Sequence, residues 1–115
     1  MTDRTPTLSF RIDFPNGARF GPGKAALLEK LIETGSINAA ATALGMSYPR
    51  ALKLVEQLNQ TFVEPLVETQ TGGKSGGGAA VTELGRLVLS LYTDICRDST
   101  TVNRSILTKL TALCV

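Results

Sequence analysis

The stretch that decides the fold is Ser36–Pro49, which reads Ser-Ile-Asn-Ala-Ala-Ala-Thr-Ala-Leu-Gly-Met-Ser-Tyr-Pro. It opens with a serine, a favourable N-cap, and its alanine-rich run lets a second helix approach closely. Gly45 breaks this run, and Ser47 is then a second N-cap with Pro49 in the first turn that follows. The stretch predicts a short helix, a tight turn and a longer helix over about residues 48–62.

The longer helix has two distinct faces. The expected inner face is apolar and consists of Ala51, Leu54, Val55, Leu58 and Phe62. The opposite stripe is polar and consists of Ser47, Arg50, Lys53 and Gln57. Residues 36–53 contain two basic and no acidic residues, a local bias that the net charge of +2 conceals.

On the N-terminal side, residues 7–14 alternate between apolar and polar side chains and predict a half-buried strand. Pro15-Asn16-Gly17 provides the residues of a turn. Pro22 suits the first turn of a helix with an apolar stripe, and Gly35 suits its C-terminal end.

On the C-terminal side, residues 66–70 and 79–82 read as strands that flank five glycines within residues 71–78. This pattern predicts a hairpin with a glycine-rich tip. Thr82 is the N-cap of a last helix, which would extend about 45 Å if it ran unbroken to Ala112. The weak helix formers at 98–101 are the expected place for a kink or break.

Length and composition limit the function classes. The 115 residues, 43% apolar and 19% charged, indicate one globular domain. The chain has no histidine and two cysteines, Cys96 and Cys114, so we expect no enzyme, no catalytic residues, no metal site and no cofactor. We expect Cys96 to pack near a helix interface. No stretch suits a membrane span or a secretion signal, so a cytoplasmic protein without membrane contact is expected.

The element order predicts a mainly α fold with a small β component, a winged helix-turn-helix. Its parts are an N-terminal strand at 7–14, a β-hairpin wing and a long C-terminal dimerisation helix. Residues 1–82 would form the DNA-binding domain and 83–115 the helical dimerisation segment. The alternative is an ordinary pair of helices meeting at a corner.

Such a fold predicts binding to double-stranded DNA, because a recognition helix enters the major groove with its N-terminal turns. Ser47 and Tyr48 can reach phosphates, and Arg50 and Lys53 can reach guanine O6 and N7. The candidate DNA-binding residues are Ser36, Ser47, Tyr48, Pro49, Arg50, Lys53 and Gln57, with Gly72, Gly73, Lys74, Ser75, Gly76 and Gly77 in the wing. The alternatives are a solvated helix face and a winged-helix module that binds protein instead of DNA.

The wing suits a nucleic-acid backbone or minor groove, because glycines allow close approach and Lys74 adds charge. A nucleotide phosphate loop is excluded, since Glu68 stands where that motif needs its first glycine. The last helix is too long for so small a domain to cover, so we expect a partner chain on it. The candidate dimer-interface residues are Leu84, Val88, Leu91, Ile95, Val102 and Ile106.

Several of these segments carry a family resemblance. They are Gly35-Ser36-Ile37, Ala40-Ala41, Gly45-Met46-Ser47-Tyr48, Asn59-Gln60, Leu66-Val67-Glu68 and the stretch over residues 71–79. Over about residues 20–95 the chain resembles the N-terminal DNA-binding domain of ModE-type molybdate-responsive regulators. It is more loosely similar to the LysR-type helix-turn-helix. The glycine-rich wing is the most specific part of the match.

The resemblance implies a homodimer on a palindromic operator, held together by the long terminal helix and the N-terminal strand region. It places Ser47, Tyr48, Arg50 and Lys53 on recognition-helix positions and residues 72–78 on the wing. The family pattern adds C-terminal molybdate-binding domains, for which this chain has no β-rich extension. We therefore expect no molybdate site in this chain.

Overall fold

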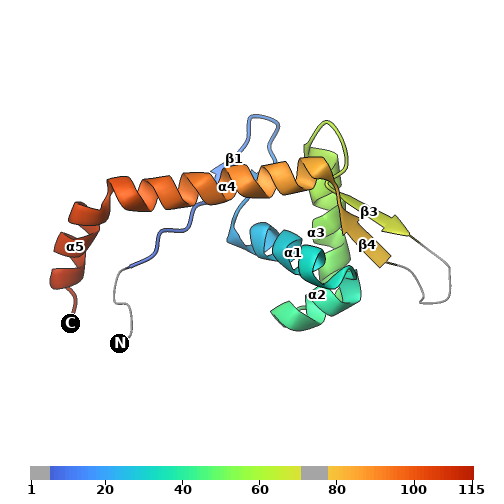
Figure 1. The fold of residues 1–115 in the computed structure, drawn as a ribbon, viewed down its shortest axis with the longest axis horizontal. Coiled ribbons are helices and arrows are strands. Elements are labelled where there is room, and N and C mark those ends of the chain that lie inside the picture. The colour runs from blue at the N-terminus through green and yellow to red at the C-terminus, as the bar shows by residue number, and fades with distance from the viewer. Residues whose placement is uncertain (1–5, 71–77) are drawn as a thin grey trace.

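A computed structural model describes residues 6–70 and 78–115 of the chain. It confirms a mainly helical fold with two small antiparallel hairpins, the architecture of a winged helix-turn-helix (Figure 1). In chain order the elements are β1 (Ile12–Asp13), β2 (Arg19–Phe20), α1 (Pro22–Thr34), α2 (Ile37–Leu44), α3 (Tyr48–Thr61), β3 (Val67–Gln70), β4 (Gly78–Val81), α4 (Glu83–Val102) and α5 (Arg104–Ala112).

The core lies where α1, α2 and α3 meet beneath the first half of α4 (Figure 1). Its largest fully buried side chains are Phe20, Leu27, Leu28, Leu31, Leu58, Leu66 and Val67. Ala40, Ala41 and Ala51 are at most 1% exposed at the contacts between helices. Because these side chains are so small, the helix backbones approach closely, as the alanine-rich run predicts.

The prediction of one strand over residues 7–14 is wrong in extent. Only Ile12 and Asp13 join a ladder, and they pair with Phe20 and Arg19 across the turn at 15–17. The ladder stops there because the chain enters α1 at Pro22 and supplies no further partner strand. The predicted alternation of exposed and half-buried side chains nevertheless holds from residue 7 to residue 14.

The last helix is not continuous. It is interrupted at Asn103, just after the segment 98–101 in which the sequence places a kink or break. The hydroxyls of Thr100 and Thr101 donate to the carbonyls of Cys96 and Arg97, and the Asn103 amide side chain donates to the Ser99 carbonyl at 2.8 Å. Such side-chain bonds to helix carbonyls compete with the regular ladder and bend helices. The second part, α5, turns away from α4 at its far end (Figure 1).

Candidate nucleic-acid interface

The turn between α2 and α3 is held by caps at both helices. The Ser36 hydroxyl accepts from the Ala39 amide at 3.1 Å, and the Ser47 hydroxyl accepts from the Arg50 amide at 3.3 Å. Between the helices, Gly45 has a φ of 69°, a left-handed conformation that favours glycine. These contacts set the direction in which α3 leaves α2.

One face of α3 belongs to the core, and the opposite face is open to solvent. Ala51, Val55 and Leu58 are buried, while Leu54 and Phe62 are half-buried. The polar stripe of Ser47, Arg50, Lys53 and Gln57 is exposed along its whole length, as are Tyr48 and Pro49. The packed face holds the helix in place, so the exposed side chains project from a rigid support.

The cations on this stripe are available to a partner. Arg50 and Lys53 form no ion pair with any residue in 6–70 or 78–115. The first amides of α3 have no helix carbonyl to donate to, as at every helix N-terminus. Of these, Pro49 has no N–H, and the Arg50 amide donates to the Ser47 hydroxyl. Cationic side chains and free helix amides together suit phosphate and base-edge contacts.

The wing is attached to α3 by Asn59, which sequence reasoning did not single out for this role. Its carboxamide oxygen accepts from the amides of Leu66 and Val67 at 2.9 and 3.0 Å, and its nitrogen donates to the Val67 carbonyl at 2.9 Å. The wing strands β3 and β4 pair from Val67 opposite Val81 to Gln70 opposite Gly78.

Strand β4 of the wing also touches the start of the helix-turn-helix. The Ala79 amide donates to the Gly35 carbonyl at 2.9 Å, next to the N-cap of α2. The predicted wing-tip residues Gly72, Gly73, Lys74, Ser75, Gly76 and Gly77 lie outside the described residues.

The predicted dimer-interface residues divide into two groups. Leu84 and Val88 are half-buried against the core of their own chain. The exposed ones are Leu91 at 53%, Ile95 at 46%, Val102 at 80% and Ile106 at 57%. Leu87 and Leu110, at 52% and 57%, are exposed as well and were not among the predicted residues, although Leu87 stands one helical turn before Leu91.

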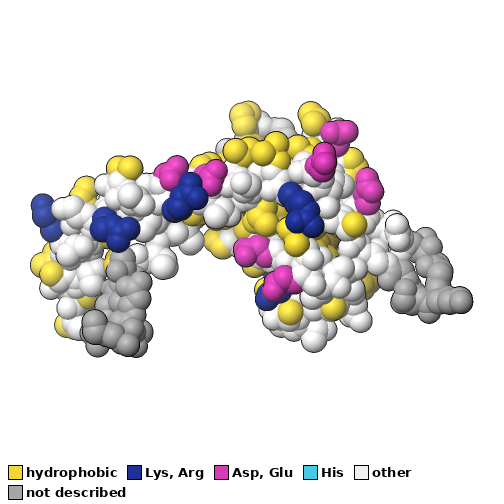
Figure 2. All heavy atoms as spheres, in the orientation of Figure 1, with side chains coloured by type: hydrophobic (Ala, Val, Ile, Leu, Met, Phe, Trp, Pro, Cys, Tyr) yellow, Lys and Arg dark blue, Asp and Glu magenta, His cyan; other side chains and the backbone are white. Residues whose placement is uncertain are grey.

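These exposed residues make α4 apolar on its outer side. Leu87, Leu91 and Ile95 follow one another at steps of four, so they share one face of the helix. Figure 2 shows apolar side chains gathered along the upper edge of the molecule, over the right-hand half of α4. Contiguous exposed apolar surface of this kind is typical of an interaction site.

Cys96 is half-buried and packs against the core, as its position predicts, whereas Cys114 is exposed. No group of three or more potential metal-binding side chains occurs among residues 6–70 and 78–115. In the same part of the chain, no helix is both long and apolar enough to cross a membrane.

Known proteins similar to this chain share the helix-turn-helix part. The MopB molybdenum-pterin-binding protein of Rhodobacter capsulatus is 42% identical over 76 residues, which cover 66% of this chain and 28% of that protein. The transcriptional regulator ModE of Yersinia pestis is 42% identical over 71 residues, 62% of this chain and 27% of that protein. The DNA-binding transcriptional dual regulator ModE of Escherichia coli K12 is 39% identical over 71 residues, with the same coverage.

The matched part thus spans little more than a quarter of each of these relatives. The family model of the bacterial regulatory helix-turn-helix proteins matches residues 24–86, which is more than half of the chain. Those residues run from the first turn of α1 through α2, α3 and the wing to the first turn of α4. The chain therefore belongs to the lysR family of bacterial regulatory helix-turn-helix proteins.

Proposed function

We propose that the chain is a DNA-binding transcriptional regulator that places α3 in the major groove and the wing on the backbone or in the minor groove. The observation that carries the proposal is the exposed stripe of Ser47, Arg50, Lys53 and Gln57 on a helix whose other face is locked into the core. An acidic or apolar stripe would favour a protein partner instead. The names of two relatives, both transcriptional regulators, support the same function.

We further propose that two copies act together on a palindromic operator. Residues 1–82 would read the DNA, and residues 83–115 would supply most of the dimer contact through the exposed side chains of α4 and α5. Covering this apolar helix face with a second copy would remove it from water, which lowers the free energy. Two symmetry-related recognition helices then require two inverted half-sites.

The test is selection of bound duplexes from a random DNA pool by the purified chain, with and without molybdate. We expect recovered sequences with two inverted half-sites and no dependence on molybdate. The logarithm of the binding constant should fall against the logarithm of salt concentration with a slope of about −5 to −7, if each protomer makes about three or four phosphate contacts. A slope near zero with no recovered duplex would rule out DNA binding.

Arg50→Ala tests the major-groove contact. If Arg50 reads a guanine, its loss should weaken binding by about 1–3 kcal/mol and relax preference at one position of each half-site. Uniform weakening across all sequences would make Arg50 a phosphate contact. Lys30→Ala is the matched control, because Lys30 lies on α1 and already pairs with Glu33 at 3.1 Å.

A further inference from the structure

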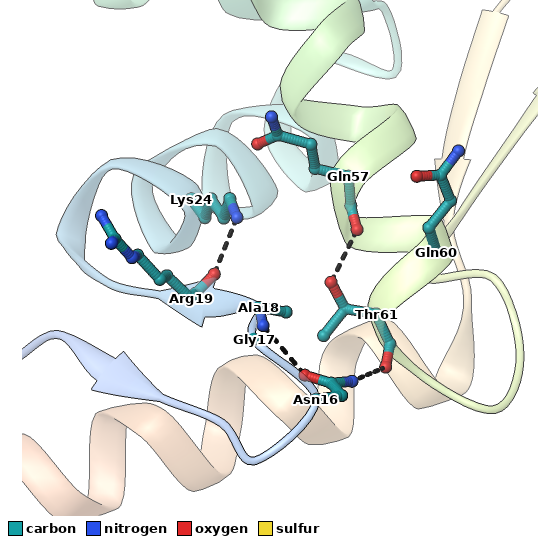
Figure 3. Close-up of a pocket in the computed structure, with 8 residues that line it drawn as sticks. All are labelled: Asn16, Gly17, Ala18, Arg19, Lys24, Gln57, Gln60 and Thr61. Carbon is teal, nitrogen blue, oxygen red and sulfur yellow. Dashed lines mark hydrogen bonds between the residues drawn. The ribbon is translucent and has the colours of Figure 1, made fainter.

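An open cavity of about 490 Å³ lies between the N-terminal hairpin, the start of α1 and the last two turns of α3 (Figure 3). None of the proposed DNA contacts other than Gln57 belongs to it. Apart from Gly17 and Ala18, the lining residues are polar, namely two cations, three carboxamides and one hydroxyl, and none of them is acidic. The lining residues are Asn16, Gly17, Ala18, Arg19, Lys24, Gln57, Gln60 and Thr61.

Hydrogen bonds hold the walls of the cavity in place. The Asn16 carboxamide donates to the Thr61 carbonyl at 3.2 Å and accepts from the Ala18 amide at 3.0 Å, which ties the hairpin turn to the end of α3. Phe14 and Phe62 stack edge to face just beyond this bond, with ring centroids 5.7 Å apart. The opening therefore exists before any ligand arrives.

Positive charge is concentrated at one wall. Lys24 Nζ donates to the Arg19 carbonyl at 2.7 Å, which brings the ammonium group beside the Arg19 residue (Figure 3). Partial burial, and after it the Arg19 charge, lowers the pKa of Lys24 below its ordinary value. Arg19 pairs with the Asp13 carboxylate at 3.6 Å, and Asp13 also pairs with Arg11 at 3.1 Å.

The start of α1 makes the electrostatic potential at this wall more positive. Lys24 stands in the first turn of this helix, where a basic residue is electrostatically unfavourable. The first turn contains no acidic residue, and the N-cap Gly21 has no side chain to cap the free amides. An anion at this place would offset both the like charges and the uncapped amides.

We propose that this cavity is a binding site for a phosphate-type oxyanion. Lys24 supplies the charge at the cavity, and the Gln57 carboxamide supplies a neutral donor from the opposite wall. Arg19, whose guanidinium points away from Gln57 in Figure 3, adds only to the positive potential nearby. In Figure 3 the Gln57 side chain reaches from α3 toward the wall that carries Lys24. Charge-assisted hydrogen bonds from several directions are what tetrahedral oxyanions require.

Two sources share this chemistry, namely a phosphate of the DNA backbone and a free oxyanion. Gln57 ends the exposed stripe of α3, so the cavity continues the surface that we propose for DNA. Binding of a backbone phosphate rests on that proposed function, whereas binding of a free oxyanion does not. The two sources are therefore tested separately.

The first test titrates inorganic phosphate into the isotope-labelled full chain and follows the carboxamide resonances of Gln57, Gln60 and Asn16 by NMR, with chloride at matched ionic strength as reference. A free-oxyanion site predicts saturable shifts at Gln57. The phosphate affinity obtained from these shifts should fall about tenfold or more in Lys24→Met. It should be retained in Lys24→Arg and in the control Lys30→Met. Because Lys24→Met also loses the bond to the Arg19 carbonyl, Arg19→Gln is made as a second variant and each variant's thermal unfolding midpoint is measured.

The second test measures DNA affinity against salt concentration for the same variants. A backbone-phosphate site predicts a slope that is less steep by about 2 for a dimer in Lys24→Met, with uniform weakening across sequences and no change in Lys30→Met. If Lys24→Met changes only the phosphate affinity, the site binds a free oxyanion. If it changes only the salt dependence of DNA binding, the site binds a DNA phosphate. No effect in either overturns the proposal. If the unmodified chain binds no DNA, the proposed function fails and the phosphate titration alone decides the oxyanion site.

Discussion

Gly85 occupies a place in the first turn of α4 that no larger residue fits. A Cβ atom there would lie 2.5 Å from the Leu66 carbonyl oxygen and 2.7 Å from Val81 Cγ1. Both atoms belong to the wing strands or the residue before them, so the contact lets α4 cross close to the base of the wing. The sequence offers no local sign of this, because Gly85 stands in an otherwise regular helical pattern.

Gly85→Ala should therefore destabilise the protein by about 1–3 kcal/mol through overpacking. The measurement is the free energy of unfolding in urea. Gly23→Ala is the matched control, since Gly23 also stands in a first helical turn but has nothing within 4 Å of its would-be Cβ. The free energy of unfolding of the control should rise by about 0.4–1 kcal/mol, because alanine restricts the unfolded chain. Equal effects of the two substitutions would refute the close crossing.

Tyr92 joins the N-terminal segment to α4. Its hydroxyl donates to the Phe10 carbonyl at 2.6 Å, and its ring packs edge to face on Phe20 at 5.0 Å. Tyr92→Phe keeps the ring contact and removes only the hydrogen bond. It should lower the free energy of unfolding by about 0.5–1.5 kcal/mol, measured in urea. An unchanged value would mean that this bond does not hold residues 6–11 on the helix.

The same residue predicts a loss of stability at high pH. Burial, followed by the neighbouring Cys96, raises the pKa of Tyr92 above its ordinary value. A raised folded-state pKa favours the neutral phenol, so its contribution is full below about pH 10 and is lost as the pH rises through the folded-state pKa. Unfolding in urea at increasing alkaline pH should show a loss that is smaller in Tyr92→Phe. A loss of equal size in both proteins would assign it to other groups.

At the scale of the secondary-structure elements, the hydrogen bonds that hold β3 against α3 come from the Asn59 side chain. Asn59→Ala would leave the amides of Leu66 and Val67 without the oxygen that they share. We expect a loss of about 1–3 kcal/mol in the free energy of unfolding, with faster hydrogen exchange at these two amides. Asn38→Ala on the exposed side of α2 is the control, expected to change stability by no more than about 0.5 kcal/mol. Slow exchange retained in Asn59→Ala would contradict this role.

Local patterns predict the helices of this protein well. The start of α1 at Pro22, the caps at Ser36, Ser47 and Thr82, and the end of α1 at Gly35 all agree with the structure. Each depends on contacts within one helical turn, which the order of residues specifies. The extent of β1 depends on whether a second strand lies beside it, and alternation alone carries no information about that strand.

At the scale of the whole molecule, α4 and α5 extend beyond the core and leave their apolar side chains uncovered (Figure 2). Leu91→Glu should convert the proposed dimer to monomers, because each copy would place a charge in the apolar contact. The measurement is sedimentation velocity at several concentrations. Thr93→Glu adds the same charge on the opposite side of α4 and should leave the dimer intact. A Leu91→Glu protein that stays dimeric would remove this face from the interface.

The sequence by itself determined the helices, the tight turn, the glycine-rich hairpin and the polar stripe of α3, because periodicity and capping act within a few residues. It also placed Arg50 and Lys53 on the open face, since helical spacing alone separates them from Ala51 and Val55. Only the tertiary structure decided that Leu84 and Val88 pack largely inward. It likewise brought Asn16 and Lys24 to Gln57 across one cavity. Those outcomes depend on which distant segments meet, and the order of residues does not state this.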